Sequence, residues 1–434
     1  METEIKVCPV KPFWGMKNSV IFLLAFLLPL TVLSGQKIAT IEVEINHLSV
    51  DFDHPVSVNL DDITNISDTL LSLCEVGSNY RKPVAFQVEA GDQRRLYWMV
   101  SSSSEGNSRL RYELIIAEPE HYTIVKATEG EGALTLNHED KNLLRYWFST
   151  VYPPPGVDSS YKRSGFIHPL WSPNGQVLTR IQPPDHYHHY GIWNPWTRVL
   201  FEGDTVDFWN IDSRQGTVRF ANFVSVTEGP VFACFEVLHE HVVYRKDGNE
   251  KVALNELQKI MVYKPGHQGD HFIVDFCFRF SCAGESPFRI LEYRYSGLGW
   301  RTTSEWNKDN SMVITSEGKT RKDADGSIAR WCIVQGEADN DHAGVVMMSS
   351  PSNYNHPEPL RVWPENQYER GDMFVNFCPV KTTDWLLRPR KNYSLRYRFL
   401  VFNGRMRNRQ AEQAWNDFSV MPRITITKCH PEEE

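Results

Sequence analysis

Apolar and polar residues alternate along most of the chain from residue 37 onward, which is typical of half-buried β-strands and not of helices. The clearest alternating segments are 41–45, 272–278 and 393–399. Only 409–418 repeats its apolar residues at helical spacing, with Ala411, Trp415 and Phe418 on one face. The pattern therefore predicts an all-β protein with one helix near its C-terminus.

Asn-Gly and Asp-Gly pairs separate several of these segments, and such pairs tolerate the positive φ angles of tight hairpin turns. They stand at 174–175, 247–248, 325–326 and 403–404. Each predicts a hairpin, so we expect the sheets to be antiparallel.

The segments group into three parts. We expect a signal peptide over 1–36, a small β-sandwich domain over 37–117 and a large β-sandwich domain over 118–428. About 300 residues of antiparallel strands are enough for two large sheets packed around a cleft.

The apolar segment 20–33 follows Lys17 and ends in small and polar residues, which indicates a secretory signal and hence a periplasmic or secreted protein. An uncleaved anchor is the alternative. The segment is shorter than the ~20 residues of a membrane-spanning helix, so we expect no integral membrane domain.

Net charge and aromatic content indicate which classes of binding partner to expect. The 434 residues carry a net charge of −8, which argues against nucleic acid. Aromatic residues make up 12% of the chain. Aromatic faces also bind sugars, so the composition favours a sugar or glycan partner.

The densest chemistry lies in 183–191, where three histidines fall within four residues. On an extended backbone His186 and His188 would share one face and His189 would point away. Such a pair suits one divalent metal ion, with Asp185 or a carboxylate distant in the chain as a further ligand. The alternatives are metal-free acid–base catalysis by an imidazole, or histidines that only bond to backbone carbonyls.

Four other segments offer polar partners. His168 precedes a proline, Glu292 and Arg301 flank a Gly-x-Gly, and Glu317 and Lys319 alternate in a charged hairpin. The fourth segment combines His356, Arg361 and Trp363, a mixture of donor, cation and aromatic face that suits a sugar or a carboxylate.

Several of these segments resemble the PmoA-like family of exported bacterial proteins, which carries the label "methane oxygenase". The matching segments are 161–169, 184–191, 316–319 and 356–357, and Tyr190 stands where members often have arginine. The resemblance covers about 120–420 and implies a role in carbohydrate metabolism. It also implies a large antiparallel β-sandwich similar to that of galactose-mutarotase-like enzymes.

We therefore expect an exported carbohydrate-active enzyme, a hydrolase, lyase or epimerase acting on a sugar or glycoside. The expected catalytic residues are His186, His188, His189 and a carboxylate from Glu292 or Glu317. The expected substrate-binding residues are His168, Trp193, Trp196, Arg301, Lys319, His356, Arg361 and Trp363. The alternative is a carbohydrate-binding protein without catalysis.

Overall fold

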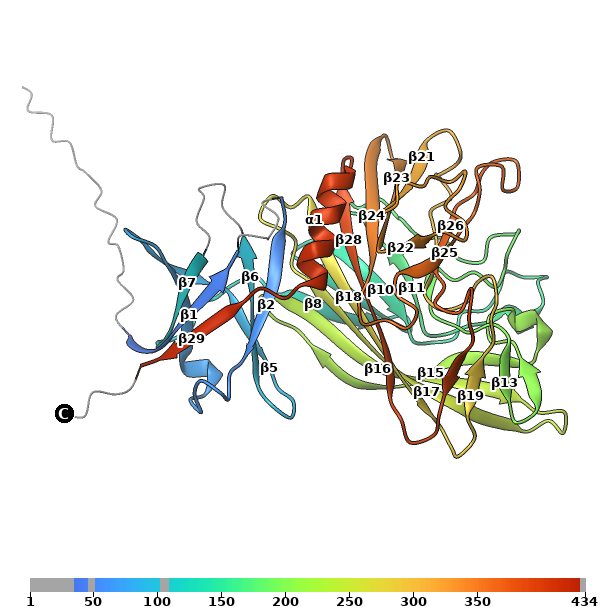
Figure 1. Cartoon of the computed structure of the whole chain (residues 1–434), viewed down its shortest axis with the longest axis horizontal. Coiled ribbons are helices and arrows are strands. Elements are labelled where there is room, and N and C mark those ends of the chain that lie inside the picture. The colour runs from blue at the N-terminus through green and yellow to red at the C-terminus, as the bar shows by residue number, and fades with distance from the viewer. Residues whose placement is uncertain (1–34, 46–50, 102–108, 430–434) are drawn as a thin grey trace, which may run out of the picture. The chain divides into compact units, whose positions relative to one another are not determined.

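The computed structural model describes residues 35–45, 51–101 and 109–429 of the 434 in the chain. The expected signal peptide therefore lies outside the described residues, except for Gly35 and Gln36. Within the described ranges nearly all regular structure is β-strand, so the predicted all-β fold is confirmed (Figure 1).

The N-terminal segment forms two antiparallel sheets with a core of their own. The larger sheet has the order β29-β1-β7-β3-β4, and the smaller has the order β2-β6-β5. Their strands are β1 (Gln36–Glu44), β2 (Asp53–Asn59), β3 (Leu71–Val76), β4 (Arg81–Val84), β5 (Phe86–Glu89), β6 (Arg95–Ser101), β7 (Arg109–Ile116) and β29 (Ile424–Lys428). Alternate residues such as Ile41 and Val43 face inward and pack with Trp98 and Tyr112.

The last strand of the chain belongs to this first sheet. β29 pairs antiparallel with β1, with Ile426 opposite Ile41, and lies beside it in Figure 1. The N-terminal sheet is therefore completed by a strand that sequence order assigns to the larger domain. The division at 117–118 stays a prediction.

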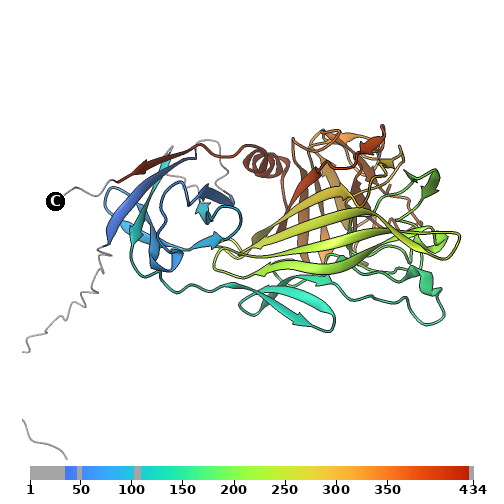
Figure 2. The ribbon, with the colours of Figure 1, turned by 90° about the horizontal axis from the view of Figure 1, so that it is seen from below.

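An eight-stranded antiparallel sheet forms one layer of the larger sandwich, in the order β15-β16-β17-β18-β28-β24-β23-β21. Its strands are β15 (Gly216–Thr227), β16 (Phe232–Tyr244), β17 (Glu250–Tyr263), β18 (His271–Cys282), β21 (Ser311–Thr315), β23 (Trp331–Ala338), β24 (Asp341–Ser349) and β28 (Tyr393–Asn403). Figure 2 shows the long yellow-green strands β16, β17 and β18 running side by side.

A nine-stranded sheet forms the other layer, in the order β22-β25-β26-β20-β12-β11-β10-β9-β8. Its strands are β8 (Val125–Gly130), β9 (Ala133–His138), β10 (Lys141–Trp147), β11 (Phe166–Leu170), β12 (Ile192–Trp193), β20 (Gly299–Arg301), β22 (Ile328–Ala329), β25 (Glu358–Val362) and β26 (Phe374–Phe377). Leu136 and Trp300 from this sheet join Phe276 and Phe399 from the other in one core. The burial of these apolar faces stabilises the sandwich.

Smaller elements complete the fold. A four-stranded sheet has the order β14-β13-β19-β27, and its strands are β13 (Val199–Phe201), β14 (Asp204–Val206), β19 (Phe288–Ile290) and β27 (Trp385–Leu387). The short helices are η1 (Asp68–Leu70), η2 (Ser159–Tyr161) and η3 (Ile211–Ser213). The predicted helix is confirmed as α1 (Asn408–Ser419), in which Ala411 and Ala414 are buried and Trp415 Nε1 donates to the Ser349 carbonyl at 3.0 Å.

The four glycine turns do not all close hairpins. Gly248 lies between the paired strands β16 and β17, and Gly175 turns the chain between bridged Trp171 and Val177. Gly326 and Gly404 also have positive φ, +81° and +74°, but Gly404 leads toward α1 and Gly326 donates to Leu360. The hairpins predicted at these two positions are wrong, because a positive φ reverses the chain without fixing what comes next.

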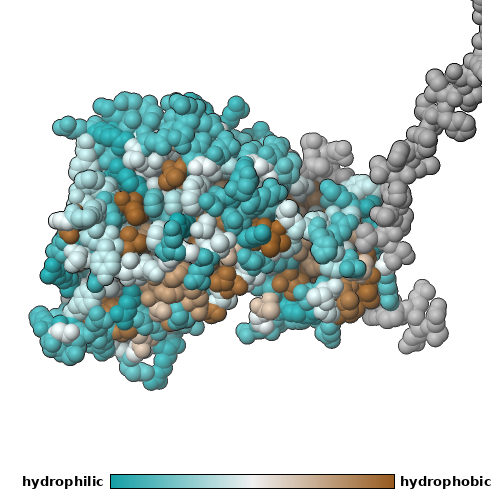
Figure 3. Space-filling view, turned by 180° about the vertical axis from the view of Figure 1, so that it is seen from behind, coloured by the Kyte–Doolittle hydropathy of each residue, from teal (hydrophilic) through white to brown (hydrophobic). Residues whose placement is uncertain are grey.

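The surface is ordinary for a globular protein. Figure 3 shows one face as mostly hydrophilic, with hydrophobic residues gathered toward its lower part. In the described part of the chain, no helix has the length and apolarity needed to cross a membrane.

Candidate functional site

The histidines lie at the tip of a short hairpin. A bridge between Ile181 and Tyr190 holds its base, and Gln182 N donates to the His189 carbonyl at 2.8 Å. The tip consists of consecutive turns, since His186 N donates to Pro183 and His189 N donates to His186, at 2.8 and 3.0 Å. The backbone at the tip is therefore curled, and not extended.

The curled backbone brings all three imidazoles together. Ring centroids are 5.1 Å apart for His186 and His188, 4.6 Å for His186 and His189, and 4.9 Å for His188 and His189. One nitrogen from each ring lies within 4.8 Å of the others. The expectation that His189 points away is wrong, because alternation holds only on an extended strand.

The three rings differ in exposure. His189 is buried, at 3% exposure, whereas His186 and His188 are partly exposed. His189 is thus the inner ring of the cluster, and His186 and His188 are the rings that solvent reaches.

Burial keeps two of the imidazoles neutral. It lowers the pKa of His188 to about 3, helped by the positive charges of His186 and Arg163. Burial also lowers the pKa of His189 well below its ordinary value, helped by His188 and Arg301. At neutral pH both rings therefore offer lone pairs, which is the form that binds metal ions.

Asp185 orients the third ring. Its Oδ2 lies 3.0 Å from His186 Nδ1, and Arg301 Nη2 donates to the same carboxylate at 2.9 and 3.1 Å. Burial opposes ionisation of Asp185, but the His186 hydrogen bond and the Arg301 charge outweigh it and lower its pKa to about 2. An ionised Asp185 makes His186 Nδ1 the donor, so Nε2 is the nitrogen that can accept a hydrogen bond, as from the Tyr368 hydroxyl at 3.4 Å, or act as a ligand.

A second carboxylate fixes Arg301 from the other side. Arg301 is fully buried and its Nη2 also donates to Asp372 Oδ2 at 3.0 Å. Arg180 and Arg370 donate to the same Asp372 carboxylate. The carboxylates of Asp185 and Asp372 thus compensate the buried guanidinium, as a buried charge requires.

Aromatic rings surround the cluster. Trp193 and Phe374 each lie 5.0 Å from the His189 ring, and Trp363 lies 5.0 Å from His186 and 4.5 Å from the Arg301 guanidinium carbon. Trp193 and Trp363 are 3% and 5% exposed, so they back the imidazoles instead of facing solvent. The exposed aromatic residue is Tyr368, whose hydroxyl lies 3.3 Å from His186 Nδ1.

The donor set fits one transition-metal ion. Three imidazoles with an open side, two of them kept neutral by burial, match the three-ligand arrangement of catalytic zinc sites. Zn–N bonds of about 2.0–2.1 Å place ligand atoms about 3.3 Å apart, so nitrogens that lie up to 4.8 Å apart would have to approach by up to about 1.5 Å. His189 Nδ1 is buried without a hydrogen-bond partner among the described residues. A buried polar atom without a partner costs free energy, which a metal ion or ligand bound there would offset.

Three residues expected to act with the histidines do lie at the cluster, namely Trp193, Arg301 and Trp363. The expected carboxylates do not: Glu292 and Glu317 are exposed on other loops, and Glu317 accepts only from Ser316 at 3.1 Å. Spacing in the chain could not show this, because it does not fix which loops meet.

The remaining expected residues have other contacts. His168 Nδ1 bonds to Thr179 Oγ1 at 2.9 Å, and His356 stacks on Trp415 with ring centroids 6.2 Å apart. Trp196 is fully buried against Phe280 and Trp385. Lys319 and Arg361 pair with Asp323 and Asp325, at 3.1 and 2.6 Å. None of these contacts joins any of the five to the clustered histidines, so their role in substrate binding stays a prediction.

Arg180, Tyr368 and Asp372 were missed by the sequence analysis as members of the site. Arg180 precedes the hairpin and Asp372 follows the Trp363 segment, so their nearness to the histidines comes from the pairing of distant strands. The only available signal was the Arg370-Gly371-Asp372 run close to Trp363.

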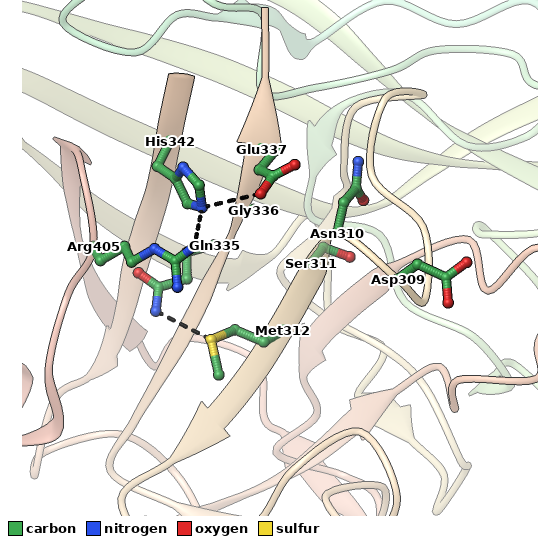
Figure 4. A pocket seen from close by; sticks show the side chains of 9 residues that line it. All are labelled: Asp309, Asn310, Ser311, Met312, Gln335, Gly336, Glu337, His342 and Arg405. Carbon is green, nitrogen blue, oxygen red and sulfur yellow. Dashed lines mark hydrogen bonds and ion pairs between the residues drawn. The ribbon is translucent and has the colours of Figure 1, made fainter. Parts of the chain in front are cut away.

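A separate pocket lies at the far end of the eight-stranded sheet. It has a volume of about 170 Å³ and is lined by Asp309, Asn310, Ser311, Met312, Gln335, Gly336, Glu337, His342 and Arg405 (Figure 4). His342 Nε2 lies 2.7 Å from Arg405 Nη2 and 3.5 Å from Glu337. These charged groups are paired with one another, and the pocket contains none of the three clustered histidines.

Fold and site together define an all-β sandwich protein that presents three converging histidines on a turn. The chain belongs to a family of unknown function, DUF6807, which matches residues 133–416. No curated protein sequence matches the chain.

The family match overturns the resemblance to the PmoA-like family, which nothing in the comparisons indicates. The histidine run that suggested it lies inside the matched range, but a short histidine-rich turn does not specify a family. The support that this resemblance gave to a carbohydrate role is lost with it.

Proposed function

We propose that the protein is a metal-dependent enzyme in which His186, His188 and His189 bind one divalent transition-metal ion. We further propose that it acts as a hydrolase, lyase or epimerase on a sugar or glycoside outside the cytoplasm. The observation that supports metal binding most directly is the convergence of three ligand nitrogens within 4.8 Å of one another. Imidazoles suit zinc, copper, iron and nickel.

The support for catalysis over a structural role is the open side of the cluster. A structural metal ion is enclosed by four protein ligands, whereas a catalytic one keeps a position for water or substrate. Here His186 and His188 are partly exposed, and among the described residues only three histidines group in this way. The ion would supply a Lewis acid that polarises a substrate oxygen.

Few side chains around the cluster could act as a general acid or base. Asp185 and Asp372 are both engaged by arginines, so neither is a ready general base. Tyr368 is 48% exposed and its hydroxyl reaches His186, so it is the group best placed to contact a substrate hydroxyl. We therefore assign the aromatic contact with a sugar to Tyr368, in place of the buried Trp193, Trp196 and Trp363.

Metal analysis tests the proposal first. The purified chain, loaded with zinc and dialysed, should retain one ion per chain, and His188→Ala should retain much less. His342→Ala is the matched control, because it removes a histidine from the separate pocket of Figure 4. Equal metal content in His188→Ala and the unaltered chain would overturn the site.

Turnover is tested on a panel of glycosides and sugars with and without a chelator. Product formation that needs metal and is lost in His188→Ala supports an enzyme. Saturable sugar binding without any product supports the carbohydrate-binding alternative instead.

A further inference from the structure

A large polar cavity lies beside η2, η3 and the start of β15. Its volume is about 570 Å³, within the range of ordinary small-molecule sites. Cations and hydroxyls dominate the lining, which includes Ser160, Lys162, Arg163, Arg214, Arg219 and Tyr244. Its lining contains none of the three clustered histidines, so this cavity is distinct from the proposed metal site.

Arg163 is the unusual member of this lining. It is 3% exposed, and its side chain makes one hydrogen bond, from Nη2 to the Phe208 carbonyl at 2.9 Å. Its buried Nε has no partner among the described residues. Burial lowers the pKa of Arg163 to about 10, so the group stays charged at neutral pH.

The other deeply buried arginines in the described part of the chain have more acceptors than Arg163. Arg301 bonds to two carboxylates, and Arg398 forms two bonds of 2.6 and 2.7 Å to Asp275. Arg321 donates to three carbonyls, at 3.0 to 3.2 Å. Nη1 of Arg321 also lacks a partner, but Arg163 has the fewest acceptors of the four, a single carbonyl, and no carboxylate of the described residues lies within ion-pair distance of it. A buried charge with so little compensation is costly.

Ser160 adds a second unsatisfied group to the same lining. Its Oγ is buried and has no hydrogen-bond partner among the described residues. Arg214 and Arg219, by contrast, are paired with Asp158 and with Glu240 and Glu250. Among the described residues, Arg163 Nε and Ser160 Oγ are therefore the buried polar atoms of this lining that have no hydrogen-bond partner.

We propose that this cavity binds an anionic saccharide, whose carboxylate or sulfate pairs with Arg163 and whose ring hydroxyls bond to Ser160 and its neighbours. An anion supplies the countercharge that Arg163 lacks, since guanidinium pairs strongly with carboxylate and sulfate oxygens. The hydroxyl-rich lining and the volume suit a sugar ring better than a bare inorganic ion.

Calorimetric titration with a matched pair of disaccharides tests this. Cellobiouronic acid and cellobiose differ only in one carboxylate, and sodium sulfate at equal ionic strength represents the free anion. We expect saturable binding of the acid and at least tenfold weaker binding of cellobiose and of sulfate. Equal binding of cellobiose, equal binding of sulfate, or no binding of the acid would each overturn the proposal.

Variants place the binding in this cavity. Arg163→Gln should raise the dissociation constant of the acid about tenfold or more, Arg163→Lys should restore part of the loss, and Arg405→Gln should leave it unchanged. Ser160→Ala, which leaves the arginine in place, should weaken binding severalfold even if Arg163→Gln proves unstable. Binding of the acid that is unaffected by Ser160→Ala would overturn the assignment.

His188→Ala separates the two proposals. It should abolish metal retention and leave the binding of the acid intact. Loss of acid binding in His188→Ala would show that the acid occupies the histidine cluster, and it would overturn the separate cavity site.

Discussion

Asp185 Oδ2 lies 3.0 Å from Nδ1 of His186, its neighbour in the chain, and because the carboxylate is ionised the imidazole must be the donor. This bond fixes the tautomer of His186 and leaves Nε2, which lies 3.4 Å from the Tyr368 hydroxyl, as the acceptor. Metal-binding histidines ordinarily have such a carboxylate behind them.

Asp185→Asn should weaken metal binding by about 10- to 100-fold, because the amide no longer demands the Nδ1 proton and increases the basicity of the ring less. Competition with a metal-sensitive dye measures the affinity. Asp325→Asn removes a carboxylate that pairs with Arg361 on the surface and should have no effect. An unchanged affinity in Asp185→Asn would mean that His186 does not ligate through the orientation proposed.

Arg301→Met should destabilise the fold by about 3–5 kcal/mol, because it leaves Asp185 and Asp372 without their buried partner. Urea unfolding followed by tryptophan fluorescence measures this. Arg390→Met is the control, since Arg390 pairs with Glu285 on the surface and its loss should change stability little. A loss below about 1 kcal/mol in Arg301→Met would contradict the buried network.

Trp193 and Trp196 should respond differently to replacement by leucine. Trp196 packs in the core with Phe280, so Trp196→Leu should cost about 3 kcal/mol of stability without changing metal affinity. Trp193 lies 5.0 Å from the His189 ring, so Trp193→Leu should alter metal affinity as well. Unfolding curves and metal titrations on both variants test the contrast, which fails if the two show the same pattern.

Tyr368→Phe should lower turnover of any substrate identified, because the hydroxyl beside His186 is lost while the ring remains. Steady-state kinetics with Tyr80→Phe as the control measure this. If kcat of Tyr368→Phe equals that of the unaltered chain, the Tyr368 hydroxyl takes no part in proton transfer.

Stability should fall as pH rises through the titration of Glu358. This carboxyl is fully buried, and burial raises its pKa to about 7, although Ser349, Asn353 and Tyr397 donate to it. The native state therefore favours the protonated form, whose contribution is complete below the unfolded pKa of 4.5 and is lost as pH rises to about 7.

Over that window the loss should be on the order of 3 kcal/mol. Glu358→Gln keeps a neutral amide in place and should flatten the profile between pH 4.5 and 7. Urea unfolding at half-unit pH steps measures it. An unaltered chain whose stability rises across this window, or a Glu358→Gln profile that falls as steeply, would contradict the assignment.

Local patterns were sufficient for the strands and the helix. The alternation over 272–278 and 393–399 appears as β18 and β28, and the apolar face of 409–418 appears as α1. These elements are determined by near neighbours, because a half-buried strand or helix must place apolar residues at its own period. The pairing of β29 with β1 had no such signal, since it joins residues nearly 400 positions apart.

The candidate site also has a part that local sequence predicted and a part that only the tertiary structure showed. The composition of 183–191 alone gave His186, His188 and His189 as a group, because they are adjacent in the chain. The sequence could not tell that His189 joins the other two, because that depends on the backbone curling into turns instead of extending. Nor could it tell that Asp372 and Tyr368 approach while Glu292, Glu317 and His356 do not.

The sequence by itself determined that this protein is built of antiparallel strands and that one loop concentrates its imidazoles. Only the tertiary structure decided which carboxylates and cations surround that loop, and that the buried Arg163 has one carbonyl acceptor and, among the described residues, no carboxylate within ion-pair distance. The reason is physical: periodicity is set by each residue's own neighbours, whereas a charge is compensated by whichever distant strand packs beside it.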